Sequence, residues 1–288
     1  MMRAHVRRFR VLLGVVVFGS CGGPPIGAQV LFDAAQGTLP QQQGWDYVAL
    51  PGAAVLAHTG SAARLDTGGS AREQAGFATI APAVLDRAAG FAVEFMARLI
   101  EENHAHPDRA GFSVIVLDQE ARGIELGFWR DRVFAQADVP LFTHAEDAAL
   151  AWGDEASTFS LSFTGLEYSL FVDGARVLRG PLRDYSAFAG GFDVYETPNF
   201  LFLGDDTTSA GAVMELSRVA LVRPVRLAME PPGVIVWEGV PGTRYTVEAG
   251  VGLDGVWKEA GQGISVGAEF RFSIPTRQTF ERLRVRYP

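Results

Sequence analysis

Cysteine is nearly absent from this chain, because Cys21 is the only one among 288 residues. A disulfide within the chain is therefore excluded, and the fold must be stabilised by burial of apolar side chains. Long apolar runs are scarce as well, and the one at residues 11–18 is too short to cross a bilayer. Apolar stripes with a 3.6-residue period are missing, which argues against the alternating strand and helix folds that hold nucleotides.

Positive charge is also in short supply. The chain has 25 lysine and arginine residues against 33 acidic residues, which gives a formal net charge of −8. The first 28 residues hold four of the arginines and no acidic residue, so their removal would take the net charge to −12. Such a surface repels phosphate backbones, and we expect no nucleic acid partner.

The first 28 residues are typical of a bacterial signal peptide, with a basic start followed by the short apolar run. Cleavage after Ala28 would release a secreted or periplasmic protein that begins near Gln29. Alternatively, residues 17–21 resemble a lipobox, which would leave the protein anchored through a lipid on Cys21. We expect release, because Phe18 stands where such motifs usually carry an aliphatic residue. Neither route leaves a transmembrane segment.

Most of the remaining chain has the pattern of short β-strands. Residues 91–99 alternate between apolar and other side chains, which places Phe91, Val93, Phe95, Ala97 and Leu99 on one face. Asp173-Gly174 predicts a tight hairpin, because both residues tolerate a positive φ. Further strands are expected at 112–117, 123–129, 132–136, 158–164, 167–172, 176–178, 200–204 and 213–222, with short helical turns at 81–87 or 147–151. The pattern predicts an all-β protein built as a two-sheet antiparallel sandwich.

A proline-rich stretch divides the chain into two domains. Residues 224–233 are expected to form a linker between a large sandwich at 29–223 and a small β-module at 234–288. The module has about five short strand patterns in some 55 residues. Without a disulfide, that size is near the lower limit for an independent core, so we expect the module to depend on its neighbour.

Several motifs carry a resemblance to a known class of proteins. They are residues 32–40, 43–45, 109–115, 123–129 and 199–207. Over residues 31–222 the chain resembles exported bacterial proteins of the concanavalin A-like, laminin-G-like jelly-roll class. Residues 245–249, with Leu253 and Trp257, resemble the small immunoglobulin- or fibronectin-like β-module often appended to such proteins. The resemblance implies a jelly-roll fold and a glycan-binding face, but no particular activity.

Two carboxylates are the candidates for catalysis. Retaining glycosidases on this fold place carboxylates at alternate positions of one strand. Glu125 offers one, but Gly123 and Gly127 stand where its partners should be. Glu94 could pair with Glu125 only if their strands are neighbours. We therefore expect no catalytic residues, and regard both glutamates as residues of a solvent-facing sheet surface.

Two motifs suggest metal binding. His104, His106 and Asp108 match the His-x-His-x-Asp pattern of metal-dependent hydrolases, but a β-strand follows where those proteins have a helix. The second motif, Asp205-Asp206-Thr207, gathers oxygen atoms at the end of a strand, which suits Ca²⁺. An exposed hairpin loop is the more ordinary explanation of the first motif, and the composition of the second also makes an ordinary polar turn. Calcium remains the one cofactor that the sequence suggests.

For sugar binding, aromatic rings near amides and acids are the relevant feature, because rings stack on sugars while polar groups orient them. The candidates are Trp129, Trp152, Tyr185, Tyr195 and Asn199. Core packing explains at least half of these rings equally well. The sequence thus favours an exported, non-enzymatic protein that binds glycan or another cell-surface ligand through its sandwich. A carbohydrate-active hydrolase or lyase, or a purely structural surface protein, remains open.

Overall fold

The computed structural model describes residues 28–70, 72–191 and 193–223, followed by six strands between residues 228 and 286. Contacts divide the described chain into a unit from Gln29 to Arg223 and a second unit that holds the later strands. Residues 1–27 of the predicted signal peptide, including Cys21, lie outside the described residues, and Ala28 begins strand β1. Among the residues that are described, no helix is long and apolar enough to cross a membrane.

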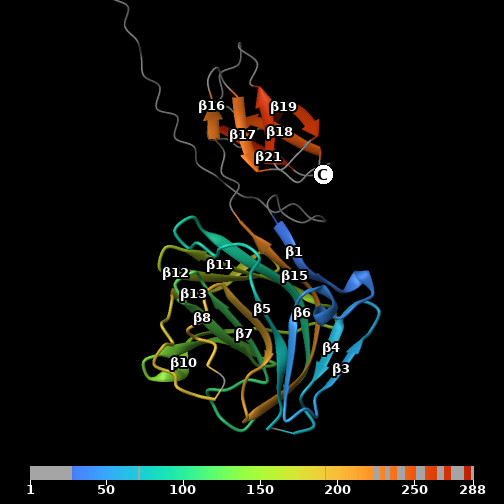
Figure 1. Cartoon of the computed structure of the whole chain (residues 1–288), viewed down its shortest axis with the longest axis vertical. Helices are drawn as coiled ribbons and strands as arrows, with labels where there is room; N and C mark the ends of the chain where they lie inside the picture. The colour runs from blue at the N-terminus through green and yellow to red at the C-terminus, as the bar shows by residue number, and fades with distance from the viewer. Residues whose placement is uncertain are drawn as a thin grey trace, which may run out of the picture. The chain divides into compact units, whose positions relative to one another are not determined.

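One layer of the large unit is an eight-stranded sheet (Figure 1). Neighbouring strands of its main path pair antiparallel. The order is β13 (Ala175–Pro181), β12 (Glu167–Val172), β11 (Ser157–Thr164), β6 (Phe91–His104), β15 (Ala210–Val222), β4 (Ala63–Asp66) and β3 (Val55–His58), with β1 (Ala28–Asp33) paired to β15.

The other layer is a seven-stranded antiparallel sheet (Figure 1). The order is β10 (Leu141–Ala149), β9 (Arg132–Asp138), β8 (Gly123–Phe128), β7 (Phe112–Leu117), β14 (Phe200–Asp205), β5 (Gln74–Ile80) and β2 (Asp46–Leu50). The helical turns expected at 81–87 and 147–151 are not formed, and residues 147–149 belong to β10 instead. Two short 3-10 helices, η1 (Ala34–Gln36) and η2 (Pro40–Gln43), lie in the stretch that holds the motifs at residues 32–40 and 43–45, just before β2.

The main core lies between the two sheets. Phe91, Val93, Phe95, Ala97 and Leu99 of β6 are all buried there, as the alternation predicted. Ring stacking continues across the strands, with the Phe95 and Phe159 centroids 4.8 Å apart. The sandwich of two antiparallel sheets, and with it the jelly-roll fold class, is therefore confirmed.

The expected hairpin between β12 and β13 is also present. Asp173 and Gly174 have φ values of 50° and 83°, which is the left-handed conformation that a tight two-residue turn requires.

The second unit contains two three-stranded sheets. One joins β16 (Ala228–Glu230), β17 (Val234–Glu238) and β20 (Glu269–Ser273), and the other joins β19 (Trp257–Ile264), β18 (Arg244–Gly250) and β21 (Arg282–Arg286). Residues 228–230, expected within the linker, form β16 and pair with β17. Val236 and Val247 are buried, as strands with a small core require.

Candidate functional site

The outer face of the seven-stranded sheet, which points away from the eight-stranded sheet, carries the candidate catalytic residue Glu125. Register places Phe202, Ile115 and Glu125 side by side on β14, β7 and β8. Residues that face the core alternate with these three, among them Leu203, Val114 and Leu126. Since successive side chains of a strand point to opposite faces, the three residues share the outer face.

Part of this outer face is hidden by a segment that we call the cover segment, residues 182–191 and 193–199. Its start is fixed by an antiparallel bridge in which the backbones of Arg183 and Gly123 exchange hydrogen bonds of 2.7 and 3.1 Å. The cover segment then lays Tyr185 and Tyr195 against the sheet. The two tyrosines form a second apolar cluster with Ile115, Leu117 and Phe200, all of which are buried.

Glu125 lies beneath the cover segment and is only 3% exposed. The Tyr195 hydroxyl donates a 2.5 Å hydrogen bond to the Glu125 carboxyl group. The Tyr185 hydroxyl accepts a hydrogen bond from the Glu125 backbone N–H and donates to the Gln136 carbonyl oxygen, at 3.1 and 2.8 Å. Burial, followed by the nearby Asp206 charge, raises the pKa of Glu125 well above its usual range. The expectation that Glu125 faces solvent is therefore wrong.

Asp206 meets Glu125 on the same face. Burial raises the pKa of Asp206, whereas hydrogen bonds with Ser113 and Glu125 lower it. The positive charge of Arg109 lowers the pKa of both carboxyl groups. Two carboxyl groups in direct contact cannot both be ionised at low cost, so the pair is suited to share one proton. Burial is the largest cause of the raised pKa of Glu125, and the Asp206 charge and the hydrogen bond to Asp206 add to it.

This carboxyl pair does not have the geometry of a glycosidase. Glycosidases separate their two carboxyl groups by roughly 5–5.5 Å or 6.5–9.5 Å, so that a sugar or a water fits between them. Glu125 and Asp206 instead contact each other directly. The hypothetical pairing of Glu125 with Glu94 is wrong, because Glu94 lies on β6 of the other sheet, opposite Ser160 and Ala220.

The glycines that flank Glu125 leave no room for a second catalytic side chain. A Cβ atom on Gly127 would lie 2.5 Å from the Phe134 ring, which covers the position. At Gly123, a Cβ atom would lie 1.8 Å from the Val116 carbonyl oxygen. Both glycines are therefore required by close packing, and neither marks a site that has lost a carboxylate.

The arrangement expected for calcium is not formed at Asp205, Asp206 and Thr207. Asp205 and Asp206 are consecutive, and their carboxyl groups lie on opposite sides of the sheet. The Asp205 carboxyl group, buried between the sheets, lies 2.7 Å from the Thr67 hydroxyl and accepts from the Thr207 N–H at 3.1 Å. Burial raises the pKa of Asp205 to about 9, so it is neutral at physiological pH. A neutral carboxyl group that faces away from Asp206 is a poor calcium ligand.

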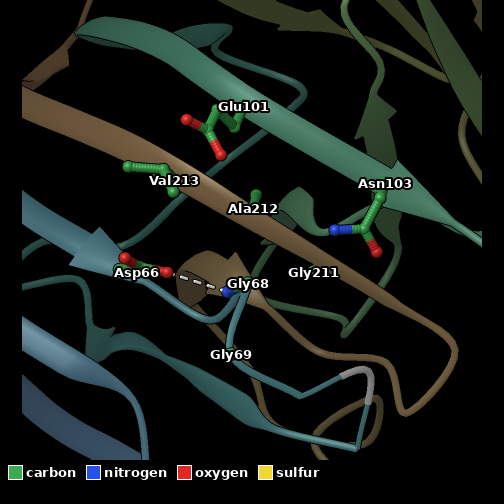
Figure 2. A pocket seen from close by; sticks show the side chains of 8 residues that line it. All are labelled: Asp66, Gly68, Gly69, Glu101, Asn103, Gly211, Ala212 and Val213. Carbon is green, nitrogen blue, oxygen red and sulfur yellow. Dashed lines mark hydrogen bonds between the residues drawn. The ribbon is translucent and has the colours of Figure 1, made fainter.

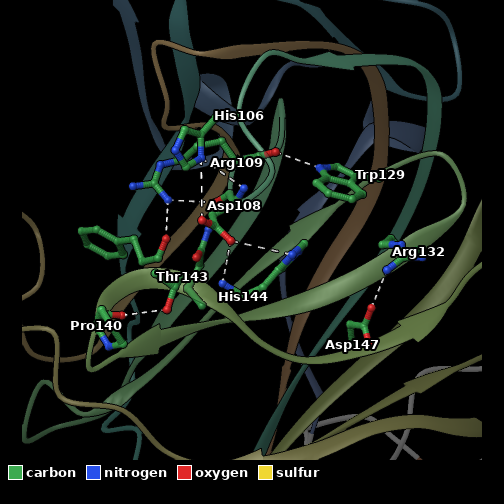
Figure 3. A network of polar contacts seen from close by, with 11 residues as sticks. His106, Asp108, Arg109, Trp129, Arg132, Pro140, Thr143, His144 and Asp147 are labelled. Atoms are coloured by element: carbon green, nitrogen blue, oxygen red, sulfur yellow. Dashed lines mark hydrogen bonds and ion pairs between the residues drawn. The ribbon is translucent and has the colours of Figure 1, made fainter.

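The histidine motif is likewise divided between separate contacts. The His104 ring stacks on Trp129 with centroids 3.9 Å apart, and His104 Nδ1 bonds to Glu102 at 3.0 Å. Meanwhile, His106 Nδ1 accepts a hydrogen bond from the Asp108 N–H. Figure 3 shows Asp108 between His106 and His144, where its carboxylate accepts from the His144 N–H at 3.0 Å. Among the described residues, no three His, Cys, Asp or Glu side chains are grouped to hold a metal.

The residues predicted to bind sugar are mostly occupied within the fold. Tyr185, Tyr195 and Trp152 are buried. Trp129 is half-buried, with the His104 ring stacked on it. The Asn199 side chain accepts a hydrogen bond from the Leu85 N–H at 2.8 Å. This placement favours structural roles for all five.

Sequence reasoning missed the part of the outer face that stays open. Toward the β2 edge, the half-buried Phe202 lies opposite Ala78, and Ala78 lies opposite the exposed Asp46. A Cβ atom on Gly76 would lie 2.4 Å from the Phe202 ring, so the missing side chain makes room for the ring. Nearby on the same face, Ile80 is 53% exposed. The available signal was the alternation within residues 200–204, which places Phe200 and Phe202 on the face opposite the core.

A separate hollow of about 190 Å³ lies on the eight-stranded sheet (Figure 2). Asp66, Glu101 and Asn103 supply its polar groups, and glycines 68, 69 and 211 supply most of the rest. The Asp66 carboxylate already accepts a hydrogen bond from the Gly68 N–H at 2.9 Å. Since no aromatic ring lines this hollow, it lacks the surface on which a sugar stacks.

No family model matches this chain, and neither does any curated protein sequence. The chain is similar to several solved structures. The metal-free carbohydrate recognition domain of Emp46p is 11% identical, with a TM-score of 0.43 over 67% of this chain and 95% of that chain. The Crh5 transglycosylase in complex with NAG is 13% identical, with a TM-score of 0.45 over 74% and 88%. A Bacillus subtilis protein of unknown function with a galectin-like fold is 11% identical, with a TM-score of 0.43 over 67% and 96%. These likenesses concern the fold alone.

Proposed function

We propose that this chain is an exported, non-enzymatic β-sandwich protein that binds glycan on the open part of the outer face, between β2 and β14. The supporting observation is the half-buried Phe202 ring, which lies in one row with Ala78 and the exposed Asp46. An aromatic ring offers a surface for the C–H groups of a sugar, and a carboxylate accepts hydrogen bonds from its hydroxyls. Gln74, also half-buried and near Asp206 on this face, adds an amide.

A carbohydrate-active hydrolase or lyase is the alternative from another class of function. It would need acidic or basic side chains that reach a bound sugar. The two carboxyl groups that converge on the outer face, Glu125 and Asp206, contact each other, and Glu125 is buried. Their contact favours binding over cleavage.

A glycan array probed with the chain from residue 29 to 288 tests the proposal. We expect binding to at least one glycan, and Phe202→Ala should weaken it by about 1–2 kcal/mol, or roughly 5- to 30-fold in Kd. Leu166→Ala is the matched control, because Leu166 is 64% exposed at the β11–β12 turn of the other sheet. Its binding should equal that of the wild type.

Three outcomes would contradict the proposal. If Phe202→Ala binds as tightly as the wild type, the ligand lies elsewhere. If a bound glycan is shortened on incubation, the protein is an enzyme. If no glycan binds, the purely structural role becomes the better account.

A further inference from the structure

The cover segment is held to the sheet partly by ordinary ion pairs and hydrogen bonds. The Arg183 guanidinium donates to both Glu146 oxygens at 2.8 and 2.9 Å. Asp184 adds two contacts, since its N–H donates to the Asp138 carboxylate and its own carboxylate pairs with Arg122, both at 3.1 Å. Each of these contacts joins a carboxylate to a guanidinium or to a backbone N–H.

The contact beneath Tyr195 is different, because it depends on a proton. Tyr195 donates to Glu125, which is itself in contact with Asp206. Ser113 supports Asp206 from β7, and Arg109 is the positive charge that acts on both carboxyl groups. With one shared proton, this network places a single negative charge opposite Arg109. Without the proton, both contacting carboxyl groups would be negatively charged, and one of them, Glu125, is buried.

We propose that the cover segment is a lid, and that the proton shared by Glu125 and Asp206 keeps it closed. Removal of that proton leaves two carboxylates in contact, and their charges are stabilised by hydration. Water reaches them when the part of the cover segment around Tyr195 moves away from the sheet. Opening would expose the buried Ile115, Leu117 and Phe200, which adjoin the half-buried Phe202. Opening of the lid therefore enlarges the open part of the outer face. The identity of a ligand for this larger surface rests on the proposed function.

The direction of the pH effect follows from burial. In the closed form, burial raises the pKa of Glu125 well above its ordinary value of 4.5, so Glu125 keeps its proton. In the open form, water restores a pKa close to that ordinary value. The closed form is then fully favoured in acid, and it loses stability as the pH rises above about 4.5. One linked proton makes the opening constant rise by up to about tenfold per pH unit.

Hydrogen exchange of the full chain tests this lid. Amides of the cover segment should exchange faster as the pH rises from 5 to 8, after correction for the intrinsic rate at each pH. Glu125→Gln should abolish this slope, because the amide keeps the shape and cannot ionise. Glu94→Gln is the matched control, since partial burial also raises the pKa of Glu94, which lies on the other sheet. It should leave the slope unchanged.

The lid would be overturned if the exchange rate of the cover segment still rose with pH in Glu125→Gln. It would also be overturned if exchange rose equally with pH in the cover segment and in β6, since that would indicate opening of the whole sandwich. Should Glu125→Gln fail to fold, Tyr195→Phe replaces it. That variant removes the hydroxyl that donates to Glu125 and should speed exchange of the cover segment at every pH. Unchanged exchange in Tyr195→Phe would also overturn the lid. Exchange is measured without glycan, so failure of glycan binding leaves the result interpretable.

Discussion

The outer faces of the two sheets differ in how they meet their surroundings. On the eight-stranded sheet, Glu94, Met96 and Arg98 of β6 point outward and are half-buried. On the seven-stranded sheet, the outward-facing Ser113, Ile115 and Leu117 of β7 are as buried as the core. The cover segment contributes to this difference, because its tyrosines pack on Ile115 and Leu117 of the seven-stranded sheet. Glu125 on one outer face is therefore buried, whereas Glu94 on the other is only half-buried.

The difference has consequences for charge. Burial raises the pKa of Glu94, with Arg218 nearby to oppose the shift. Burial raises the pKa of Glu125 much further, and the nearby Asp206 adds to the shift. The same residue type at the same kind of strand position is thus a partly hydrated surface group in one sheet and a buried carboxyl group with a strongly raised pKa in the other.

The largest effect is expected at Gly123, where β8 meets the cover segment. Gly123→Ala would place a Cβ atom 1.8 Å from the Val116 carbonyl oxygen, so the strand and the bridge to Arg183 must shift. We expect a loss of about 3 kcal/mol or more in the free energy of unfolding, measured in urea. Gly191→Ala is the control within the cover segment, because its Cβ atom would meet nothing within 4 Å. Equal stability of the two variants would show that the packing around Gly123 is not as described.

Removal of each glutamate compares the two outer faces directly. At pH 5, Glu125→Ala should cost about 2–3 kcal/mol of unfolding free energy, because it leaves a cavity and removes the partner of the Tyr195 hydroxyl. Glu94→Ala should change stability by less than about 1 kcal/mol. Chemical denaturation of both variants decides the matter. Similar losses in the two would mean that the cover segment does not bury Glu125.

Asp205 extends the comparison to the space between the sheets. Its pKa of about 9 means that wild-type stability falls as the pH rises from about 4 to 9, because only the unfolded chain releases the proton easily. Asp205→Asn cannot ionise, so it should stabilise the protein at pH 8 by on the order of 1–3 kcal/mol and have little effect at pH 4. Thermal unfolding at the two pH values measures this difference. A destabilised variant at pH 8 would indicate that Asp205 is ionised in the fold.

The smallest effect is expected on the open surface of the eight-stranded sheet. Arg179 and Glu167 form an ion pair 2.5 Å long, with both side chains more than half exposed. Arg179→Ala should change the unfolding free energy by less than about 0.5 kcal/mol, and added salt should remove even that difference. If Arg179→Ala lowers the unfolding free energy by more than about 1 kcal/mol at low salt, this outer face is less exposed to water than the half-buried side chains of β6 indicate.

Local patterns in the sequence were enough to predict most of the fold. The alternation at residues 91–99 predicted the buried face of β6, and Asp173-Gly174 predicted the hairpin. The difference between the two outer faces was also present in the pattern. Residues 112–117 are almost continuously apolar, which is typical of a strand that is buried on both faces.

The polar network was not predictable in the same way. Glu125 and Asp206 meet only because β7 lies between β8 and β14, and the order of strands is not encoded in any local pattern. The division of the Asp205-Asp206 pair between two faces depends on where β14 ends. Likewise, the two tyrosines chosen as sugar-binding residues are buried because the segment that carries them packs against the sheet.

The most direct test of the covered outer face is a carbon-13 NMR titration of the glutamate side-chain carboxyl groups, with Glu125→Gln and Glu94→Gln used to assign the signals. We expect the Glu125 signal to titrate well above the ordinary value of 4.5, at a higher pH than Glu94. A Glu125 signal that titrates near that ordinary value, together with the signal of Glu94, would contradict burial of Glu125 beneath the cover segment.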